Sequence, residues 1–359
     1  MKMDIKLENI DSELMIKNFR IKANKKEIKT PEKASYSTNS ISGINEIYRK
    51  FSINSLRTTS LDKILKSESY ETSVNSRIKS EVRNNLNLFI VDYCDDNIPN
   101  QKHLEALSDT QYVYSDVVVT PVFSSFFRND ELLGDNLIDT FIELTNKYIE
   151  IVETLNNKDI MGVIPIKAPR NYYDKIFDNY YDKDITSFII DFDGKSSDTN
   201  LPKIRKLFRL LKDHDLLESS ILYGLNVSEG KFMKDATEIP ARDFISLGFG
   251  FDIIGLNHVP PRMPTESWKE IATKRRTYRL FNRNNYGYVK VSEDDIFSKG
   301  ISGKTNVVKH NNTEQFKEAT KIKEFMAQDP TIEPYLSSKS HVTEKTIDKI
   351  KKLRNDTFK

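Results

Sequence analysis

The fold class of this chain is decided by three apolar runs, which read IMGVIPI (160–166), ITSFIIDF (185–192) and SILYGLNV (220–227). Each run is rich in Val, Ile, Leu and Phe, which is typical of a strand covered on both faces of a parallel sheet. Between the last two runs, residues 201–212 repeat apolar positions at the spacing of an amphipathic helix, with Pro202 at its start. The region therefore predicts parallel strands that alternate with helices.

The same alternation extends outward in both directions. Further apolar runs are LFIVDY (88–93), DVVVTPVF (116–123) and FDIIGLNHV (251–259), and residues 136–156 have helical periodicity. Strand–helix units repeated every ~30 residues imply right-handed crossovers. With one or two weaker units from the first third of the chain, the pattern predicts an α/β fold, a (β/α)8 TIM-type barrel. An open doubly wound sheet is the alternative, but no run is followed by a glycine-rich phosphate-binding turn.

The two ends of the chain show different patterns. Residues 1–31 predict an N-terminal hairpin that ends at Pro31. Residues 32–80 are weakly patterned, and we expect only a short helix over 44–51. After a polar linker at 299–309, helices are expected over 312–328 and 343–354. We therefore divide the chain into a barrel with its hairpin, 1–300, and a small helical C-terminal extension, 301–359.

Composition excludes several classes of protein. The 359 residues carry a net charge of +2 and are 38% hydrophobic, so wholesale disorder is excluded. No apolar run is long enough to span a membrane, and the first residues lack the apolar core of a secretory signal. Cys94 is the single cysteine, and no two histidines have metal-ligand spacing. We expect a cytoplasmic protein with no membrane contact, no metal and no cofactor.

Charge is unevenly distributed along the chain. Residues 92–159 contain 14 acidic and four basic residues, whereas residues 262–290 contain eight basic and two acidic residues. We expect this basic segment to bind phosphates, with the contacts made by Arg262, Lys274, Arg275, Arg276, Arg279 and Arg283. It also carries aromatic side chains that could stack on bases, namely Trp268, Tyr278, Phe281, Tyr286 and Tyr288. A solvated basic helix is the alternative interpretation.

Candidate catalytic groups follow the predicted strands. In a parallel barrel, catalytic side chains lie at the carboxyl ends of the strands. Asp92, Asp191, Asp193 and His258 occupy such positions. Asp191 and Asp193 are two residues apart and share a face, so they could work as acid and base or hold a divalent cation. The alternatives are that the aspartates cap helices or turns and that His258 makes a structural hydrogen bond.

Several motifs resemble the tRNA-guanine transglycosylases. These motifs are FRIKANKKEIKTP (19–31), LFIVDYCDD (88–96), ILYGLNVSEG (221–230), ISLGFGFDIIGLNHVPPR (245–262), FNRNNYGYVKV (281–291) and VVKHNNTEQFKEATKIKEF (307–325). The resemblance implies a (β/α)8 barrel that binds tRNA or DNA and exchanges guanine for a 7-deazaguanine base, as a pentosyltransferase of tRNA modification. It also implies that Asp92 is the catalytic aspartate at its strand end.

Some positions depart from the family pattern. Gly255 stands where the family has its nucleophilic aspartate, Ile166 and Lys167 replace a Gln-Gly-Gly turn, and the cysteines of the family's zinc site are missing. If the chain is active, we expect Asp92 to act as the acid or base, and Asp191 or Asp193 could replace the missing nucleophile. The alternatives are a non-catalytic nucleic-acid-binding subunit that partners an active homologue, as a homo- or heterodimer, and an unrelated barrel enzyme that uses Asp191 and Asp193.

Overall fold

A computed structural model describes most of the chain. The described residues are 3–36, 41, 43–82, 84–127, 134–155, 158–233, 235–260, 277–298, 300–301 and 303–358. Of the predicted phosphate-binding residues, Arg262, Lys274, Arg275 and Arg276 lie outside these ranges, as does Trp268.

The centre of the molecule is a six-stranded parallel sheet. Its strands run in the order β4 (Glu32–Lys33), β13 (Ile253–Ile254), β11 (Leu222–Leu225), β10 (Phe188–Asp191), β9 (Ile160–Pro165) and β8 (Val118–Val119). The helices between them are α4 (Asp135–Leu155), α5 (Tyr173–Tyr181) and α6 (Leu201–Asp213). The predicted alternation of parallel strands and helices is confirmed.

A second parallel sheet adjoins the first at both of its edges. It consists of β5 (Ile44–Ser52), flanked by β6 (Thr59–Ser60) and β7 (Leu86–Tyr93). Isolated parallel bridges join Ser35 to Asn45 and Asp92 to Val122, beside β4 and β8 respectively. The helix expected over 44–51 is therefore wrong, because this segment forms eight parallel pairs with β7.

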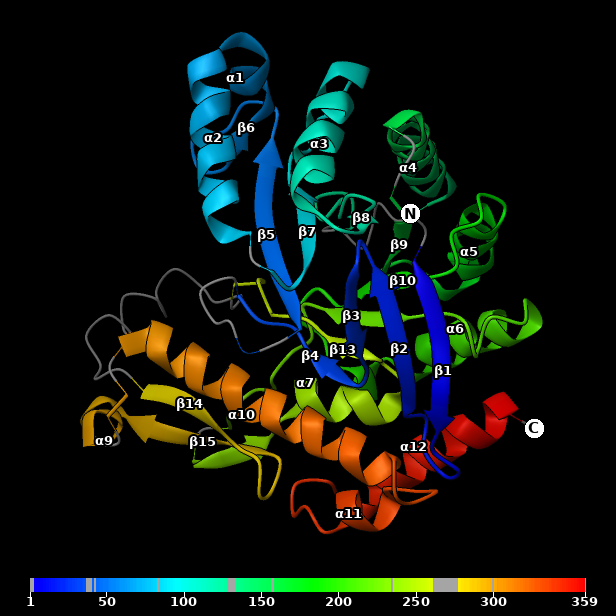
Figure 1. Ribbon diagram of the computed structural model, residues 1–359, viewed down its shortest axis with the longest axis vertical. Helices are drawn as coiled ribbons and strands as arrows, with labels where there is room; N and C mark the ends of the chain where they lie inside the picture. Colours follow the sequence, from blue (N-terminus) through cyan, green and yellow to red (C-terminus); the bar gives the residue numbers. More distant parts are fainter. Residues whose placement is uncertain are drawn as a thin grey trace.

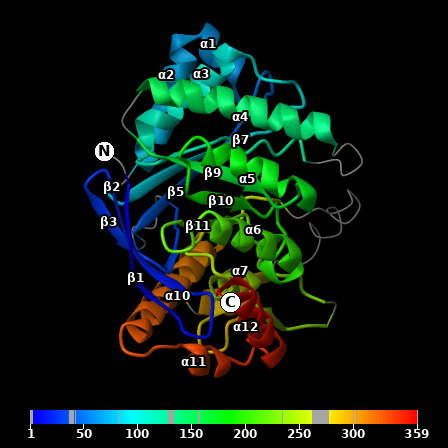
Figure 2. The same ribbon diagram turned by 90° about the vertical axis from the view of Figure 1, so that its right-hand side faces the viewer.

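Alternate residues of the parallel strands belong to two separate apolar clusters. Ile90, Val163, Ile189 and Tyr223 pack together on one face. The intervening positions pack against helices that include α3 (Gln101–Tyr114), α4, α5 and α6. Figure 2 shows α4, α5 and α6 as a layer over the strands. Burial on both faces explains why the sequence reads as nearly continuous apolar runs.

The N-terminal residues form an antiparallel sheet of β1 (Asp4–Ile10), β2 (Lys17–Ala23) and β3 (Lys26–Lys29). Asn24 and Lys25 have positive φ angles in the tight turn between β2 and β3, so the predicted hairpin is confirmed. Phe19 and Ile21 of β2 join the same apolar cluster as Ile90 and Val163. This sheet therefore covers apolar ends of the parallel strands, as Figure 1 shows for β1 to β3.

The last third of the chain packs along the lower side of the molecule in Figure 1. Its elements are β12 (Glu238–Pro240), α7 (Arg242–Ile245), β14 (Thr277–Asn282), β15 (Gly287–Ser292), α9 (Glu293–Ser298), α10 (Gly303–Met326), α11 (Glu333–Ser337) and α12 (Glu344–Phe358). Helix α10 begins at Gly303, so the polar linker expected up to residue 309 is wrong. Ala319 and Ile322 of α10 share a core with Phe281 and Tyr286. The division at residue 300 stays a prediction.

The first third of the chain also contains helices between parallel strands. Helices α1 (Leu61–Lys66) and α2 (Glu68–Glu81) connect β6 to β7. The sequence did not indicate them. Within the part of the chain that the structure describes, no helix combines the length and apolar character needed to cross a membrane.

Candidate active site at the carboxyl ends of the strands

Strand alternation brings polar side chains to one end of the sheet. Asp92 is two residues beyond Ile90 on β7, and Asp191 is two residues beyond Ile189 on β10. Each aspartate therefore points to the same face as the apolar residue before it, at the carboxyl end of its strand. Both side chains are buried, and the negative charge of Asp92 is one of the causes that raise the pKa of Asp191. The structure thus brings two of the predicted catalytic residues together.

Asp191 is held in a polar but buried position. Asn226, directly after β11, donates a hydrogen bond from Nδ2 to Asp191 Oδ1 over 2.8 Å, and the Asp193 backbone N–H donates to the same oxygen. Burial raises the pKa of Asp191 to about 7, and the negative charges of Asp193 and Asp92 act in the same direction. Asp191 is therefore a group that can hold or release a proton near neutral pH.

Asp193 has a different environment from Asp191. Its Oδ2 lies 2.7 Å from the Nζ of Lys167, which is largely buried two residues beyond the end of β9. The Lys167 ammonium thus supplies the positive charge beside this carboxylate pair. Among the described residues, no group of three or more His, Cys, Asp or Glu side chains is arranged to hold a metal ion. The geometry therefore favours an ion pair over a cation bound by Asp191 and Asp193.

Asp92 is connected to His258 through Tyr48. The Tyr48 hydroxyl donates to Asp92 Oδ2 over 2.7 Å, and the Tyr48 ring stacks on the imidazole of His258 with 3.9 Å between centroids. The Lys50 ammonium lies 3.9 Å from the same Asp92 oxygen. Burial and the charges of Asp92 and Asp191 raise the pKa of Tyr48 far above its usual value, so Tyr48 remains a hydrogen-bond donor.

Glu46 holds His258 in place through a buried contact with its ring. The Glu46 carboxylate is fully buried and contacts the Nε2 of His258 and the hydroxyl of Tyr223, and it accepts a 3.0 Å hydrogen bond from the Leu256 backbone N–H. The His258 backbone N–H in turn donates to Asn226 Oδ1. His258 therefore has a firm structural role in holding the site, and its ring is positioned beside Tyr48.

The sequence analysis missed several side chains of this site. Glu46, Tyr48 and Lys50 are alternate residues of β5, whereas Lys167 and Asn226 follow β9 and β11. The alternation of a strand places Glu46, Tyr48 and Lys50 on one face. The sequence contains no clear signal for this alternation, because Asn45 and Arg49 on the other face are polar as well.

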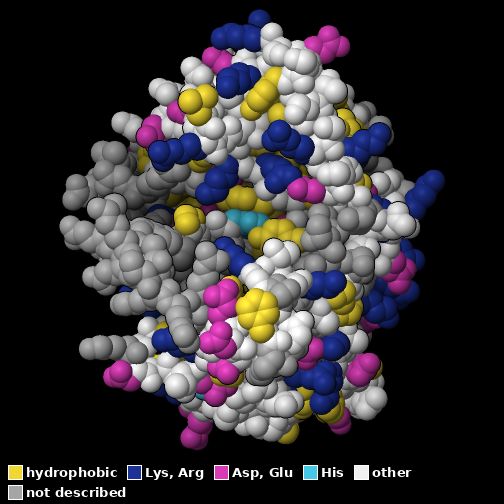
Figure 3. Space-filling view, turned by 90° about the vertical axis from the view of Figure 1, so that its left-hand side faces the viewer, with side chains coloured by type: hydrophobic (Ala, Val, Ile, Leu, Met, Phe, Trp, Pro, Cys, Tyr) yellow, Lys and Arg dark blue, Asp and Glu magenta, His cyan; other side chains and the backbone are white. Residues whose placement is uncertain are grey.

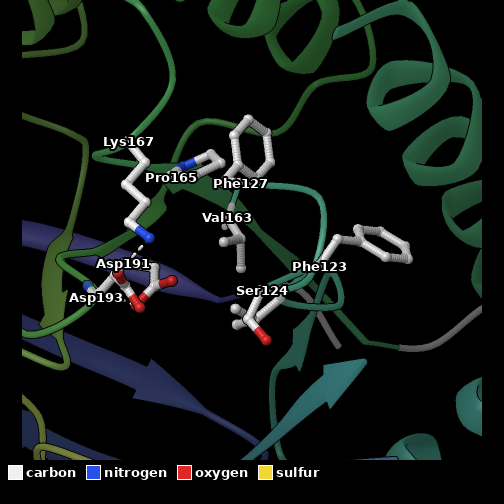
Figure 4. Close-up of a pocket in the computed structure, with 9 residues that line it drawn as sticks. Phe123, Ser124, Phe127, Val163, Pro165, Lys167, Asp191 and Asp193 are labelled. Atoms are coloured by element: carbon white, nitrogen blue, oxygen red, sulfur yellow. Dashed lines mark hydrogen bonds and ion pairs between the residues drawn. The ribbon is translucent and has the colours of Figure 1, made fainter. Parts of the chain in front are cut away.

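A small pocket lies beside the carboxylates. It is lined by the aliphatic and aromatic side chains of Val163, Phe123 and Phe127 on one side and by Lys167, Asp191 and Asp193 on the other. Figure 4 shows Lys167 directed at Asp193 and the aromatic rings across the pocket from them. Its volume of about 10 Å³ is room for one water molecule. A planar base therefore enters this pocket only if its wall rearranges.

The described part of the predicted basic segment makes other contacts. Arg279 donates to the Gly230 carbonyl over 2.8 Å and lies 3.3 Å from Glu229, and Arg283 pairs with Glu314 over 3.5 Å. The rings of Phe281, Tyr286 and Tyr288 are buried in the core. The expectation that these three rings stack on bases is wrong, because β14, β15 and the turn between them pack the rings into the core. There Tyr286 donates to Glu318 of α10, and Tyr288 donates to Asp243 of α7.

Comparisons with known proteins leave this site without an assignment. Neither the protein-family models nor the curated proteins contain a match to the chain. The resemblance to the tRNA-guanine transglycosylases therefore remains a proposal that rests on the quoted motifs and on the geometry of the site.

Proposed function

We propose that this protein binds nucleic acid and exchanges guanine for a 7-deazaguanine-type base at the glycosidic bond of one nucleotide, in the manner of a tRNA-guanine transglycosylase. The observation that carries the proposal is the buried pair of Asp92 and Asp191 at the carboxyl ends of β7 and β10. Two carboxyl groups in unlike environments are the usual requirement for glycosyl transfer.

The proposal includes a (β/α)8 barrel as the scaffold. Its support is the order of the parallel pairings. The six-stranded sheet has β4 at one edge and β8 at the other, and β5 pairs with β7 in the second sheet. The bridge Ser35–Asn45 joins the β4 edge to β5, and the bridge Asp92–Val122 joins the β8 edge to β7. Pairings in this order return to the starting strand after eight strands. The separation of strand residues into an inner apolar cluster and an outer, helix-covered cluster is also typical of a barrel.

The environments of the two aspartates suit different roles. The Tyr48 hydroxyl and the Lys50 ammonium both stabilise a carboxylate at Asp92. In the proposed reaction, Asp92 attacks C1′ of the nucleotide and forms a covalent ester while the bond from C1′ to the base breaks. The electron pair of that bond leaves with the base, and Asp191, whose pKa of about 7 lets it hold a proton near neutral pH, donates that proton to the base. The incoming base then attacks C1′ through a ring nitrogen, the proton of that nitrogen passes to the Asp191 carboxylate, and Asp92 leaves as a carboxylate.

A non-catalytic nucleic-acid-binding subunit is the second candidate function. The observation that favours it is at Gly255, where the resemblance would place a nucleophilic aspartate. A Cβ at this position would lie 2.5 Å from Glu46 Oε2 and from a ring carbon of Tyr223. Glu46 and Tyr223 thus fill the space that such an aspartate would need.

The covalent ester separates the two functions. Wild-type protein is mixed with RNA or DNA, denatured, and digested, and the modified peptide is identified by mass spectrometry. Base exchange predicts a nucleic acid adduct on Asp92 that Asp92→Asn abolishes while its melting temperature stays close to that of the wild type. An adduct on another residue would assign the nucleophile to that residue, whereas binding of nucleic acid with neither adduct nor exchange would favour the non-catalytic subunit.

A further inference from the structure

A large groove opens beside the candidate active site. It has a volume of about 620 Å³, within the usual range of ligand sites, and His258 and Tyr48 form part of its lining. Figure 3 shows a histidine at the floor of a hollow, with Lys and Arg side chains gathered along its upper rim. The groove is thus continuous with the residues that hold Asp92.

The rim of this groove is basic. Arg49 and Lys50 come from β5, Arg57 from the connection to β6, and Arg77 from α2, and no acidic residue is among the described lining residues. Arg49 is paired with Glu81, and Lys50 lies 3.9 Å from Asp92. Arg57 and Arg77 are exposed, and the described residues include no ion-pair partner for either guanidinium. Two full positive charges therefore face the groove.

The remaining lining groups match the other parts of a nucleic acid strand. Thr58, Thr59 and Ser73 offer hydroxyl groups of the kind that contact phosphate oxygens. Leu56, next to Arg57, is 91% exposed, and Tyr70 is partly buried in the same lining, so apolar surface is available to bases.

From this arrangement we propose that the groove binds the phosphodiester backbone of a single-stranded segment, with Arg57 and Arg77 contacting phosphates on the side of the nucleotide that enters the active site. The inference rests on the proposed function and adds a binding site to it. It places these phosphate contacts on the β5–β6 connection and α2, not on residues 262–290.

The test is a salt titration of binding to a short labelled single-stranded oligonucleotide. Each phosphate contact contributes about 0.7 to the log–log salt slope for single strands, so Arg57→Ala/Arg77→Ala should make the slope shallower by about 1.4. Arg57→Lys/Arg77→Lys keeps both charges and should keep the slope. The matched control, Arg209→Ala/Lys212→Ala, removes two exposed charges from the outer side of α6 and should leave the slope unchanged.

Three outcomes would overturn the inference. The first is the same slope for Arg57→Ala/Arg77→Ala and the wild type, which leaves the proposed function intact and moves the phosphate contacts elsewhere. The second is that Arg57→Ala/Arg77→Ala loses as much affinity for guanosine monophosphate as for the oligonucleotide, which would make the groove a site for a free nucleotide. The third is no binding of any oligonucleotide by the wild type at low salt, in which case exchange of labelled guanine decides the proposed function separately.

Discussion

Asp191 carries the clearest chemical signature at the scale of single residues. Its side chain is buried, and burial together with the negative charges of Asp193 and Asp92 raises its pKa from 3.8 to about 7. The unfolded chain has the ordinary value, so the folded chain binds this proton more tightly between the two values. The contribution to stability is therefore complete below pH ~4 and is lost as the pH rises through about 7.

Replacing Asp191 should remove this pH dependence. Between pH ~4 and about 7, the free energy of unfolding of the wild type should fall more steeply with rising pH than that of Asp191→Asn. The difference in slope should reach up to about 1.4 kcal/mol per pH unit. Asparagine retains an oxygen that accepts from Asn226 and from the Asp193 N–H. Urea unfolding of both proteins across this pH range measures the difference, and parallel curves would show that Asp191 is ionised in the folded chain throughout.

Glu46 should be a structural residue of the site. It is fully buried and satisfies the Leu256 backbone N–H, the Tyr223 hydroxyl and His258, so Glu46→Ala leaves several buried polar groups without their partner. We expect a loss of about 3–5 kcal/mol in the free energy of unfolding. Glu143→Ala, at an exposed i,i+4 pair on α4, should change it by less than about 0.5 kcal/mol. Equal effects of the two substitutions in urea unfolding would contradict the role of Glu46.

At the scale of elements, β5 shows where sequence interpretation failed. Ile44, Ile47, Tyr48 and Phe51 fall at helical spacing, and this pattern predicted a helix. In the sheet, Ile47 and Phe51 pack toward the helices, whereas Glu46, Tyr48 and Lys50 point to the opposite face. Because one face of β5 carries the polar side chains of the site, the strand lacks the apolar pattern by which buried strands are recognised. The sequence analysis therefore missed both β5 and its three site residues.

The strands whose two faces are both apolar were predicted well. Residues 88–93 and 160–166 were placed within a few residues of β7 and β9, and Asp92 and Asp191 were found because they end such runs. The aromatic residues of β14 and β15 were misinterpreted for a different reason. A basic segment with tyrosines has the composition of a nucleic acid surface, and only packing against α10 shows that Phe281 and Tyr286 are core residues.

Strand β2 is anchored to the parallel sheet by a buried ion pair. Lys17 Nζ lies 3.4 Å from Asp252 Oδ2 and donates to the Leu217 and Ser220 carbonyls. Burial raises the pKa of Asp252, the charge of Lys17 partly opposes this, and the resulting pKa is about 6. Lys17→Met should reduce the free energy of unfolding by about 3–5 kcal/mol, because it leaves the carboxyl buried without a counter-charge.

Adding Asp252→Asn to Lys17→Met should restore part of that loss, since asparagine can still accept from the Leu222 N–H without a charge. Urea unfolding of the single and double variants measures the coupling. Additive losses would show that Lys17 and Asp252 contribute independently.

At the scale of the whole molecule, the fold should be stable without zinc. The sequence has one cysteine, and the described residues include no cluster of metal-binding side chains. A strong chelator should leave the melting temperature unchanged, and elemental analysis of the purified protein should find far less than one zinc per chain. One tightly bound zinc per chain, with a lower melting temperature after chelation, would contradict this expectation.

The central claim is that Asp92 and Asp191 together exchange a base in nucleic acid, and the most direct measurement is uptake of labelled guanine into RNA and DNA across a range of pH. We predict uptake by the wild type that declines above about pH 7 as Asp191 loses its proton, and no uptake by Asp92→Asn at any pH. Wild-type uptake by folded Asp92→Asn, or no uptake by the wild type with either nucleic acid, would contradict the account.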